Sequence, residues 1–417
     1  MAHSELKILH LTTSLNGGAG VAALRIQQSQ LAAGMRSTGF SADSHGHEGW
    51  RQPGRAHDFA RRAAYKVDTR FERLEITGGD DRGFISSSSL GSSRFLSKEI
   101  QACDIVNLHW MNSGFFSVGA IGRISKPVVW TLHDEWPFHG VLHYADPKNP
   151  DRSLREPIAD SRNKSHRGLD LERHFWKRKM RLWQNFKPVI VGPSNWMADR
   201  ARRSEIFKGC PVHVVPYPID LELFSPNPIK DRDVRSHSKS TGFRLLCGAV
   251  DLNDPRKGCD LLHESLSKFN ALPMSSPSQL VLYGHDSGFN WPLETESLGY
   301  LSDAAQVAEA CRNADVFLCP SRADNLPNTV VEAISCGLPV VAYRVGGLPD
   351  MVHHKWNGYL ADPNDPSDFA EGIRWVLADH GRKLELGRHS RELVEKRHDP
   401  RTVAEKYAEI YAGCLTS

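Results

Sequence analysis

Apolar residues along this chain fall into short runs, and longer stretches with helical periodicity separate the runs. In the first half the runs predict buried strands at residues 8–11, 105–108, 128–132, 189–191 and 212–215. A glycine-rich turn after the first run leads into a predicted helix over residues 17–33. Strands that alternate with crossover segments form parallel sheets covered by helices. The first half therefore predicts an α/β domain.

A second α/β series follows a polar, charged and serine-rich stretch over residues 231–241. Its predicted strands are residues 243–247, 280–283, 316–318 and 340–342. Polar stretches of this kind connect domains, so we expect two Rossmann-like halves with a ligand at their junction. The expected boundaries are a first domain over residues 1–228, a linker over 229–242, a second domain over 243–398 and a final helix over 399–417.

Composition narrows the function classes. The 417 residues exceed one comfortable core, which agrees with two domains. The net charge of +3 is too small to indicate a nucleic-acid partner. No apolar run is long enough to span a bilayer and no apolar leader opens the chain, so we expect a cytoplasmic protein. The eight cysteines form no Cys-x-x-Cys pair, and we expect neither a disulfide framework nor a zinc site.

The segment from Pro320 to Val341 carries the strongest chemical signal. Two carboxylates, Asp324 and Glu332, are separated by seven residues. A predicted buried strand ends just before them, and a predicted helix over residues 329–336 carries the second. Ligands of open α/β sheets bind at this end of the strands, and a helix start favours a diphosphate. A carboxylate on the helix can accept hydrogen bonds from a ribose diol.

This segment resembles the donor site of a known family. The pattern Pro-Ser-x-x-acid, seven residues, Glu-Ala, then Cys-Gly-x-Pro-Val is similar to that of the GT-B retaining glycosyltransferases of family 4. The nearest branch resembles the WcaC-type enzymes of exopolysaccharide synthesis. The resemblance implies two facing Rossmann-like domains and a C-terminal helix that crosses back to the first. The chain departs from the family at Asp324, where Glu is usual, and at residues 325–328, where Gly-Phe-Gly is usual.

The resemblance also implies roles for residues of the second half. Glu332 would hold the ribose and Asp324 the donor sugar. Lys257 matches the family's Lys-Gly, whereas its usual arginine is missing at Ala249, and Arg256 is the candidate to replace it. Cations at this strand-to-helix turn would balance the two phosphates. The remaining donor-site positions, near the diphosphate and the base, are Gly284, Asn325, Leu326, Asn328 and Thr329.

Two segments of the first half add candidate contacts. Gly17 and Gly18 lie in a loop that opens a helix, where glycine lets the backbone approach a phosphate or sugar closely. His133 directly follows a predicted strand. An imidazole there can bond a sugar hydroxyl, or stabilise charge as a glycosidic bond breaks. The family has a histidine at this point, so we interpret His133 as a catalytic residue together with Asp324.

The expected reaction transfers a hexosyl group with retention from a nucleotide-diphosphate sugar to a saccharide or lipid-linked acceptor. No metal is expected, because the Asp-x-Asp at residues 231–233 lies in the linker without a preceding strand. Residues 151–208 hold fifteen Lys and Arg against seven Asp and Glu. These basic side chains would contact an anionic membrane. Alternatively, they face water on a helix whose tryptophans pack into the core.

Two alternatives stay open. Gly18-x-Gly20-x-x-Ala23, with Asp43 after a possible second strand, also matches a dinucleotide fingerprint and would indicate an NAD- or FAD-dependent oxidoreductase. The missing arginine at Ala249 and the altered loop after Asp324 would instead fit a catalytically silent nucleotide-sugar-binding subunit. Donor hydrolysis separates that subunit from an enzyme.

Overall fold

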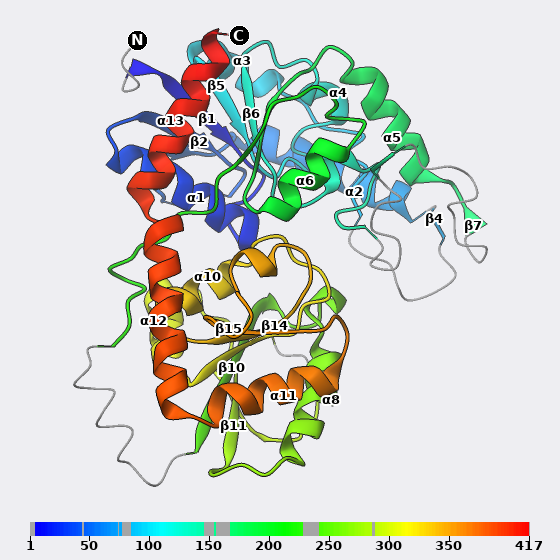
Figure 1. The fold of residues 1–417 in the computed structure, drawn as a ribbon. Coiled ribbons are helices and arrows are strands. Elements are labelled where there is room, and N and C mark those ends of the chain that lie inside the picture. Colours follow the sequence, from blue (N-terminus) through cyan, green and yellow to red (C-terminus); the bar gives the residue numbers. More distant parts are fainter. Residues whose placement is uncertain are drawn as a thin grey trace. The chain divides into compact units, whose positions relative to one another are not determined.

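The computed structural model describes residues 5–43, 46–73, 75–76, 85–145, 154–155, 167–227, 242–285 and 288–416. The chain divides into two compact units (Figure 1). Unit 1 contains Met1–Pro216 and Arg401–Ser417, and unit 2 contains Tyr217–Pro400. Each unit is an α/β fold built on a parallel sheet, so the predicted fold class is confirmed.

The described part of unit 1 holds a seven-stranded sheet in the order β3-β2-β1-β5-β6-β8-β9, with every pair parallel. The strands are β1 Lys7–Leu11, β2 Arg36–Phe40, β3 Trp50–Arg51, β5 Ile105–Leu108, β6 Val128–Thr131, β8 Val189–Gly192 and β9 Val212–Val214. The helices are α1 Gly17–Ala32, α2 Arg55–Glu72, α3 Ser97–Ala102, α4 Val118–Ile121, α5 Leu171–Leu182, α6 Asn195–Arg203 and α13 Pro400–Thr416. A short antiparallel pair, β4 Glu75–Ile76 and β7 Arg167–Gly168, lies outside the main sheet.

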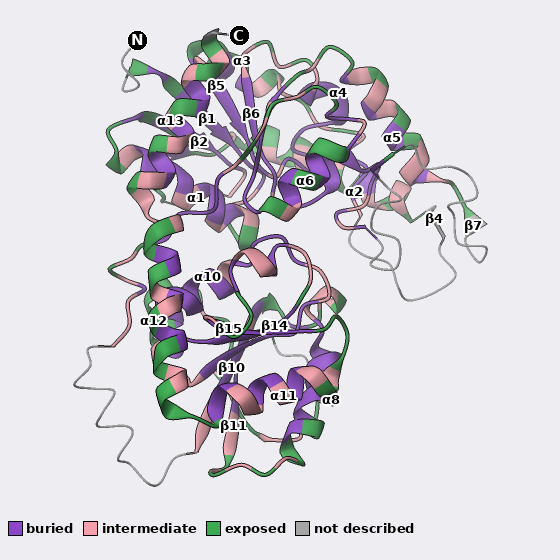
Figure 2. Ribbon diagram, in the orientation of Figure 1, coloured by how far each residue is buried: buried purple, intermediate pink, exposed green. Residues whose placement is uncertain are grey.

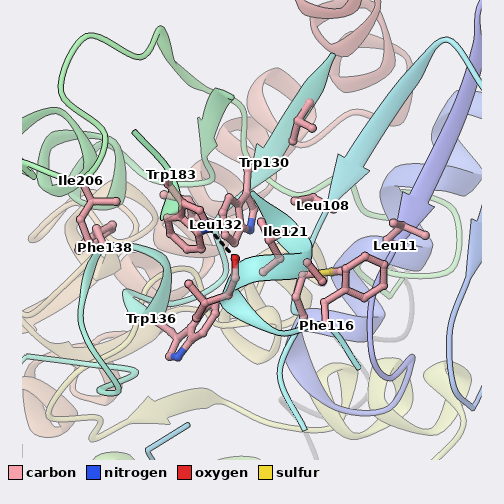
Figure 3. Packing of buried hydrophobic residues seen from close by; sticks show 14 of the residues in the cluster. Leu11, Leu108, Phe116, Ile121, Trp130, Leu132, Trp136, Phe138, Trp183 and Ile206 are labelled. Carbon is pink, nitrogen blue, oxygen red and sulfur yellow. Dashed lines mark hydrogen bonds between the residues drawn. The ribbon is translucent and has the colours of Figure 1, made fainter. Parts of the chain in front are cut away.

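The core of unit 1 is rich in aromatic side chains (Figure 3). Trp130 on β6 meets Trp183 edge to face, with ring centroids 5.4 Å apart. Trp176 and Trp183, at α5 and its C-cap, are both buried in this core. These two tryptophans of the basic stretch therefore face the protein interior, as the second of the two alternatives for that stretch expects.

The described part of unit 2 holds a six-stranded parallel sheet in the order β12-β11-β10-β13-β14-β15. The strands are β10 Phe243–Asp251, β11 Ser278–His285, β12 Glu294–Ser297, β13 Val316–Cys319, β14 Val340–Tyr343 and β15 Gly358–Ala361. The helices are α8 Cys259–Asn270, α9 Ala304–Arg312, α10 Asn328–Ser335, α11 Pro366–Leu377 and α12 His380–Arg397. α8 packs with α11, and α10 packs with α9 and α12. Figure 2 shows the central strands buried between these helices.

The last helix, α13, belongs to unit 1 (Figure 1). Its Tyr407 hydroxyl lies 3.0 Å from Thr131 Oγ1. Its Tyr411 hydroxyl accepts hydrogen bonds from Gln30 Nε2 at 2.9 Å and from Asn107 Nδ2 at 2.7 Å. These contacts confirm the implied return of the C-terminal helix to the first domain.

Unit 1 ends earlier than the expected boundary at residue 228, because the segment from Tyr217 is bonded to unit 2. Ile219 N–H donates to His398 O at 3.0 Å, and His398 Nδ1 lies 2.7 Å from Tyr217 O. Arg391 on α12 donates to carbonyl groups of residues 221 and 224. The predicted linker, apart from residue 242, lies outside the described residues.

The glycine loop before α1 predicts a stability effect. A Cβ on Gly20 would lie 2.4 Å from the carbonyl carbon of Leu15, so α1 can pack this close to the loop that precedes it only with glycine there. Such overpacking costs about 1–3 kcal/mol. Gly20→Ala should lower the free energy of unfolding in urea by at least this much. Gly413→Ala on α13, where a Cβ meets nothing within 4 Å, is the matched control and should not destabilise. Equal effects of the two substitutions would contradict the packing argument.

Candidate active site

The corner between β13 and α10 carries the two predicted carboxylates. β13 is buried and ends at Cys319, and α10 begins at Asn328. Asp324 lies in the connecting loop and Glu332 in the second turn of the helix, and both are buried. The corner is therefore at the carboxyl end of the sheet, where open α/β sheets bind ligands.

Lys257 forms an ion pair with Asp324. Lys257 Nζ donates to Asp324 Oδ2 at 2.6 Å. Lys257 follows β10 and Asp324 follows β13, and these strands are neighbours in the sheet. The structure thus brings together two predicted site residues that are 67 positions apart.

The main chain of Asp324 is held from a third loop, the one after β14. Gly347 N–H donates to Asp324 O at 3.0 Å. A Cβ on Gly346, whose φ is +54°, would lie 1.9 Å from the same oxygen, so that position requires glycine. Asn325 N–H donates to Asp324 Oδ1 at 3.0 Å. The carboxylate is therefore fixed from both its backbone and its partners.

A small pocket lies beside the ion pair. It is lined in part by Gly248, Ala249, Lys257, Ser321, Pro327 and Thr329. Ala249 thus lies in the wall of the pocket that Lys257 also lines. The position at which the family usually has an arginine is therefore part of this pocket. Gly284, with φ +118°, packs so closely that a Cβ would lie 1.8 Å from Ala249 O. The predicted base-side residue Gly284 is therefore adjacent to this wall.

The two arginines near this turn have acidic partners. Arg256 Nη2 contacts Asp254 Oδ2 at 2.5 Å, within the same turn. Arg322 contacts both carboxylate oxygens of Asp260, at 2.6 and 2.5 Å. Arg256 and Lys257 are thus both paired with a carboxylate, but Lys257 also lines the pocket beside α10, so it is the stronger candidate diphosphate ligand.

The other predicted donor-site residues lie around the start of α10. Leu326 is buried beneath the loop, whereas Asn328 and Thr329 are half-buried in the first turn. The positive end of the helix dipole at this turn favours an anion. Burial, together with the nearby Cys311 and Glu332, raises the pKa of Tyr283. Glu332 therefore lies near the β11 side of the corner.

In unit 1, the glycine loop is organised by Asp43. Asp43 Oδ1 accepts from Leu15 N–H at 2.7 Å, and Oδ2 accepts from Asn16 Nδ2 at 2.8 Å and from Ser14 Oγ at 2.5 Å. Gly17, with φ +81°, and Gly18 then open α1. A carboxylate engaged by the glycine loop in this way is poorly available to a ribose, which weakens the dinucleotide alternative at Asp43.

His133 stands at the end of a row of three histidines. His133 Nε2 lies 3.0 Å from His109 Nδ1, and His109 Nε2 lies 2.9 Å from His10 Nδ1. Burial lowers the pKa of His133 and of His10 to about 4, and it holds the pKa of His109 well below its usual value. The three rings are therefore neutral at pH 7. A neutral His133 does not supply the full positive charge that the charge-stabilising role would use.

The sequence alone identifies neither His10 nor His109 as a functional residue. His10 is a fully buried polar residue inside the apolar run that predicts β1. A histidine inside an apolar run is expected to be buried and therefore to have a hydrogen-bond partner. This expectation is the sequence signal that points to His10. The partner, His109, is 99 residues away and was not identifiable from the sequence.

Asp134, the residue after His133, belongs to a Ser-His-Asp arrangement. His143 Nδ1 lies 2.6 Å from Asp134 Oδ2, and His143 Nε2 lies 2.9 Å from Ser86 Oγ. Ser86 is buried, its N–H donates to Val141 O, and the next N–H donates to the carboxylate of Glu72. The amides that would bind an oxyanion are thus occupied, and we interpret the arrangement as a frame for the His133 loop.

Among the described residues, no group of three or more His, Cys, Asp and Glu side chains is placed to hold a metal ion. The Asp-x-Asp at residues 231–233 lies outside them. Nor does any helix in the described part of the chain combine the length and apolar character needed to cross a bilayer.

Solved structures share this fold. Sucrose-phosphate synthase from Thermosynechococcus elongatus is 17% identical, with a TM-score of 0.67 over 98% of this chain and 99% of that one. Anabaena HepE in complex with UDP and glucose is 16% identical, with a TM-score of 0.64 over 98% of this chain and 100% of that one.

Curated relatives match parts of the chain. A D-inositol 3-phosphate glycosyltransferase of Xylanimonas cellulosilytica is 30% identical over 43% of this chain and 46% of the relative. One from Corynebacterium jeikeium is 27% identical over 71% and 69%. One from Catenulispora acidiphila is 32% identical over 48% of this chain and 52% of the relative, so the matches span about half the length of this relative and of the one from Xylanimonas cellulosilytica.

Two family models cover most of the chain. The model described as glycosyltransferase family 4 matches residues 16–223, and that described as glycosyl transferases group 1 matches residues 244–379. The first match includes the glycine loop and His133, and the second includes Lys257, Asp324 and Glu332. The resemblance drawn from the donor motif is therefore confirmed: the chain belongs to the group 1, family 4 glycosyltransferases and has the GT-B fold.

Proposed function

We propose that this chain is a hexosyltransferase that takes a hexosyl group from a nucleotide-diphosphate sugar and passes it to a saccharide or lipid-linked saccharide acceptor. The observation that carries the proposal is the Lys257–Asp324 ion pair at the sheet edge, one loop away from Glu332. Lys257 would hold the diphosphate, with the start of α10 adding its dipole. Asp324 would bind hydroxyl groups of the donor sugar, and Glu332 the ribose.

In this proposal the reaction retains the anomeric configuration. Asp324 is neutralised by Lys257 and its main chain is clamped, so it is poorly suited to act as a covalent nucleophile. We therefore propose attack by the acceptor hydroxyl on the face that the leaving group departs from. The bond from C1 to the phosphate oxygen breaks, the bond from C1 to the acceptor oxygen forms, and the departing phosphate takes the acceptor's proton. We propose that no metal is required: Lys257 can donate to a phosphate oxygen as well as to Asp324, and the dipole of α10 favours an anion at its start.

The cellular setting that we propose is exopolysaccharide synthesis in the cytoplasm. The support is the WcaC-like donor motif and the match to HepE, whose structures hold UDP-glucose or UDP with glucose.

Ala249 in the pocket wall favours one other candidate function, a nucleotide-sugar-binding subunit without turnover. If the purified chain releases free sugar from UDP- or GDP-sugars with no acceptor present, the hypothesis of a binding subunit without turnover is excluded. If no sugar is released from any donor that binds, the hypothesis of an enzyme is contradicted.

The nucleotide contacts can be separated by two ligands. Glu332→Gln should weaken a nucleoside and its diphosphate alike, by about 1.5–3 kcal/mol, because both contain the ribose. Lys257→Ala should weaken only the diphosphate, by a similar amount. Arg256→Ala should cost less than Lys257→Ala, since Lys257 lines the pocket whereas Arg256 bonds Asp254 within its own turn. Calorimetry measures the affinity of each variant for both ligands, with Lys268→Ala on the exposed face of α8 as the control. Equal losses for both ligands in Lys257→Ala would refute the phosphate assignment.

His133 should act on turnover more than on nucleotide binding, because the proposed nucleotide contacts lie in unit 2. Removing a polar group that interacts chiefly with the transition state costs about a hundredfold or more in rate. His133→Ala should therefore lower donor hydrolysis by about this factor with nucleotide affinity nearly unchanged. Wild-type turnover in this variant would leave His133 with a structural role, and a parallel loss of affinity would assign it to binding.

The pH profile should show that His133 works as a neutral ring. Its folded pKa is lowered to about 4 from 6.5, so its lone pair is present above that lowered pKa and is lost as pH falls through it. Turnover should thus stay level through pH 6.5 and decline only nearer pH 4. Stability declines earlier, as pH falls from about 6.5 to about 4, because the unfolded chain binds protons near pH 6.5 and the buried rings do not. Turnover is therefore measured where circular dichroism shows a folded protein, and a midpoint at 6.5 would contradict the assignment.

A further inference from the structure

A continuous row of hydrogen bonds runs through unit 1 from His133 to the C-terminal helix. The row continues from His133 and His109 to His10, whose Nε2 lies 2.9 Å from Gln30 Oε1. Gln30 Nε2 donates to the Tyr411 hydroxyl at 2.9 Å. Neighbouring histidine rings have centroids 5.2 Å apart and planes within 26° of each other. The row therefore links β6, β5, β1, α1 and α13.

The direction of these hydrogen bonds follows from the amide of Gln30. Its Oε1 also accepts from Ser37 Oγ at 2.9 Å, and its Nε2 faces Tyr411. A carbonyl oxygen only accepts, so His10 must carry its proton on Nε2 and use Nδ1 as an acceptor. A neutral imidazole has a single N–H, so His109 must then donate from Nε2 to His10. His133 in turn donates from Nε2 to His109, and the lone pair of His133 resides on Nδ1.

We propose that Gln30 and Tyr411 are positioning residues that, through His10 and His109, hold His133 in the tautomer protonated on Nε2, so that Nδ1 accepts a hydrogen bond from a sugar hydroxyl. The role of the sugar hydroxyl rests on the function proposed above, whereas the tautomer does not. A reversed row would place a proton on Nδ1 and turn the acceptor into a donor. The C-terminal helix thus contributes to the site through Tyr411, which lies 381 positions from Gln30.

The tautomer is measured directly on the full chain by nitrogen-15 NMR of labelled histidine, with couplings that identify which ring nitrogen carries hydrogen. Substitution of His133 assigns its signals. In the unsubstituted protein we expect a single form of His133, protonated on Nε2. In Gln30→Leu and in Tyr411→Phe, which remove the acceptor and its anchor, we expect the signals to shift toward the Nδ1-protonated form or a mixture. Nδ1 protonation in the unsubstituted protein, or an unchanged tautomer in both variants, would overturn the proposal.

Two substitutions serve as matched controls. Gln27 is buried on the same helix as Gln30, but it bonds Trp50 and Ser37 O rather than a histidine. Tyr407 is buried on α13 like Tyr411, but its hydroxyl meets Thr131. Gln27→Leu and Tyr407→Phe should keep the tautomer of His133. A shift in these controls as large as in the test variants would show a general loosening of unit 1 and would overturn the proposal.

Activity provides the second measurement. Donor hydrolysis by Gln30→Leu and Tyr411→Phe should fall about tenfold or more, with nucleotide affinity unchanged, because an active-site imidazole in the wrong tautomer loses its function. Thermal unfolding shows whether each variant is folded. If Gln30→Leu does not fold, Tyr411→Phe alone tests the proposal. A shifted tautomer with unchanged hydrolysis would support the proposal that Gln30 and Tyr411 hold the tautomer of His133. It would refute the role of His133 in the proposed function.

Discussion

Parallel strand pairing is the constraint on which the site of each unit depends. In a parallel sheet every carboxyl end lies at one edge, so residues that follow different strands become neighbours. In unit 1 this edge carries the segments after β1, β5 and β6, which contain Gly17, His109 and His133. In unit 2 it carries Lys257 and Asp324, after β10 and β13, and Gly284, next to the final residue of β11. The ion pair and the pocket both follow from this arrangement.

The departures of the donor motif from its family make physical sense together. The side chain of aspartate is one methylene shorter than that of glutamate, and here Asp324 reaches Lys257 while Gly347 holds its main chain. The pocket wall has Ala249 where an arginine is usual, so Lys257 is the cation that enters this pocket. A single lysine with three N–H groups can hold Asp324 and a phosphate oxygen together. Donor-sugar and diphosphate binding would then be coupled through one side chain.

The interior of unit 1 contains several fully buried polar side chains. A buried polar group without a partner costs about 1–3 kcal/mol, so such groups persist only when each has a bond. His10, Gln30 and Asn107 are all fully buried, and each bonds another member of the row or a tyrosine of α13. Bonds of this kind specify geometry more than they add stability. They therefore suit a region that must hold one histidine in one state.

The sequence by itself determined the two α/β halves, the corner that carries Asp324 and Glu332, and the family, because apolar periodicity and a contiguous motif are local features. It also placed Lys257 and His133 at strand ends. Only the tertiary structure decided where unit 1 ends, because His398 and Arg391 bind the segment after Pro216 through contacts more than 160 residues apart in the chain. Pairings such as Lys257 with Asp324, or Gln30 with Tyr411, leave no mark in a local pattern. They arise when the sheet and the returning helix bring distant side chains within hydrogen-bonding distance.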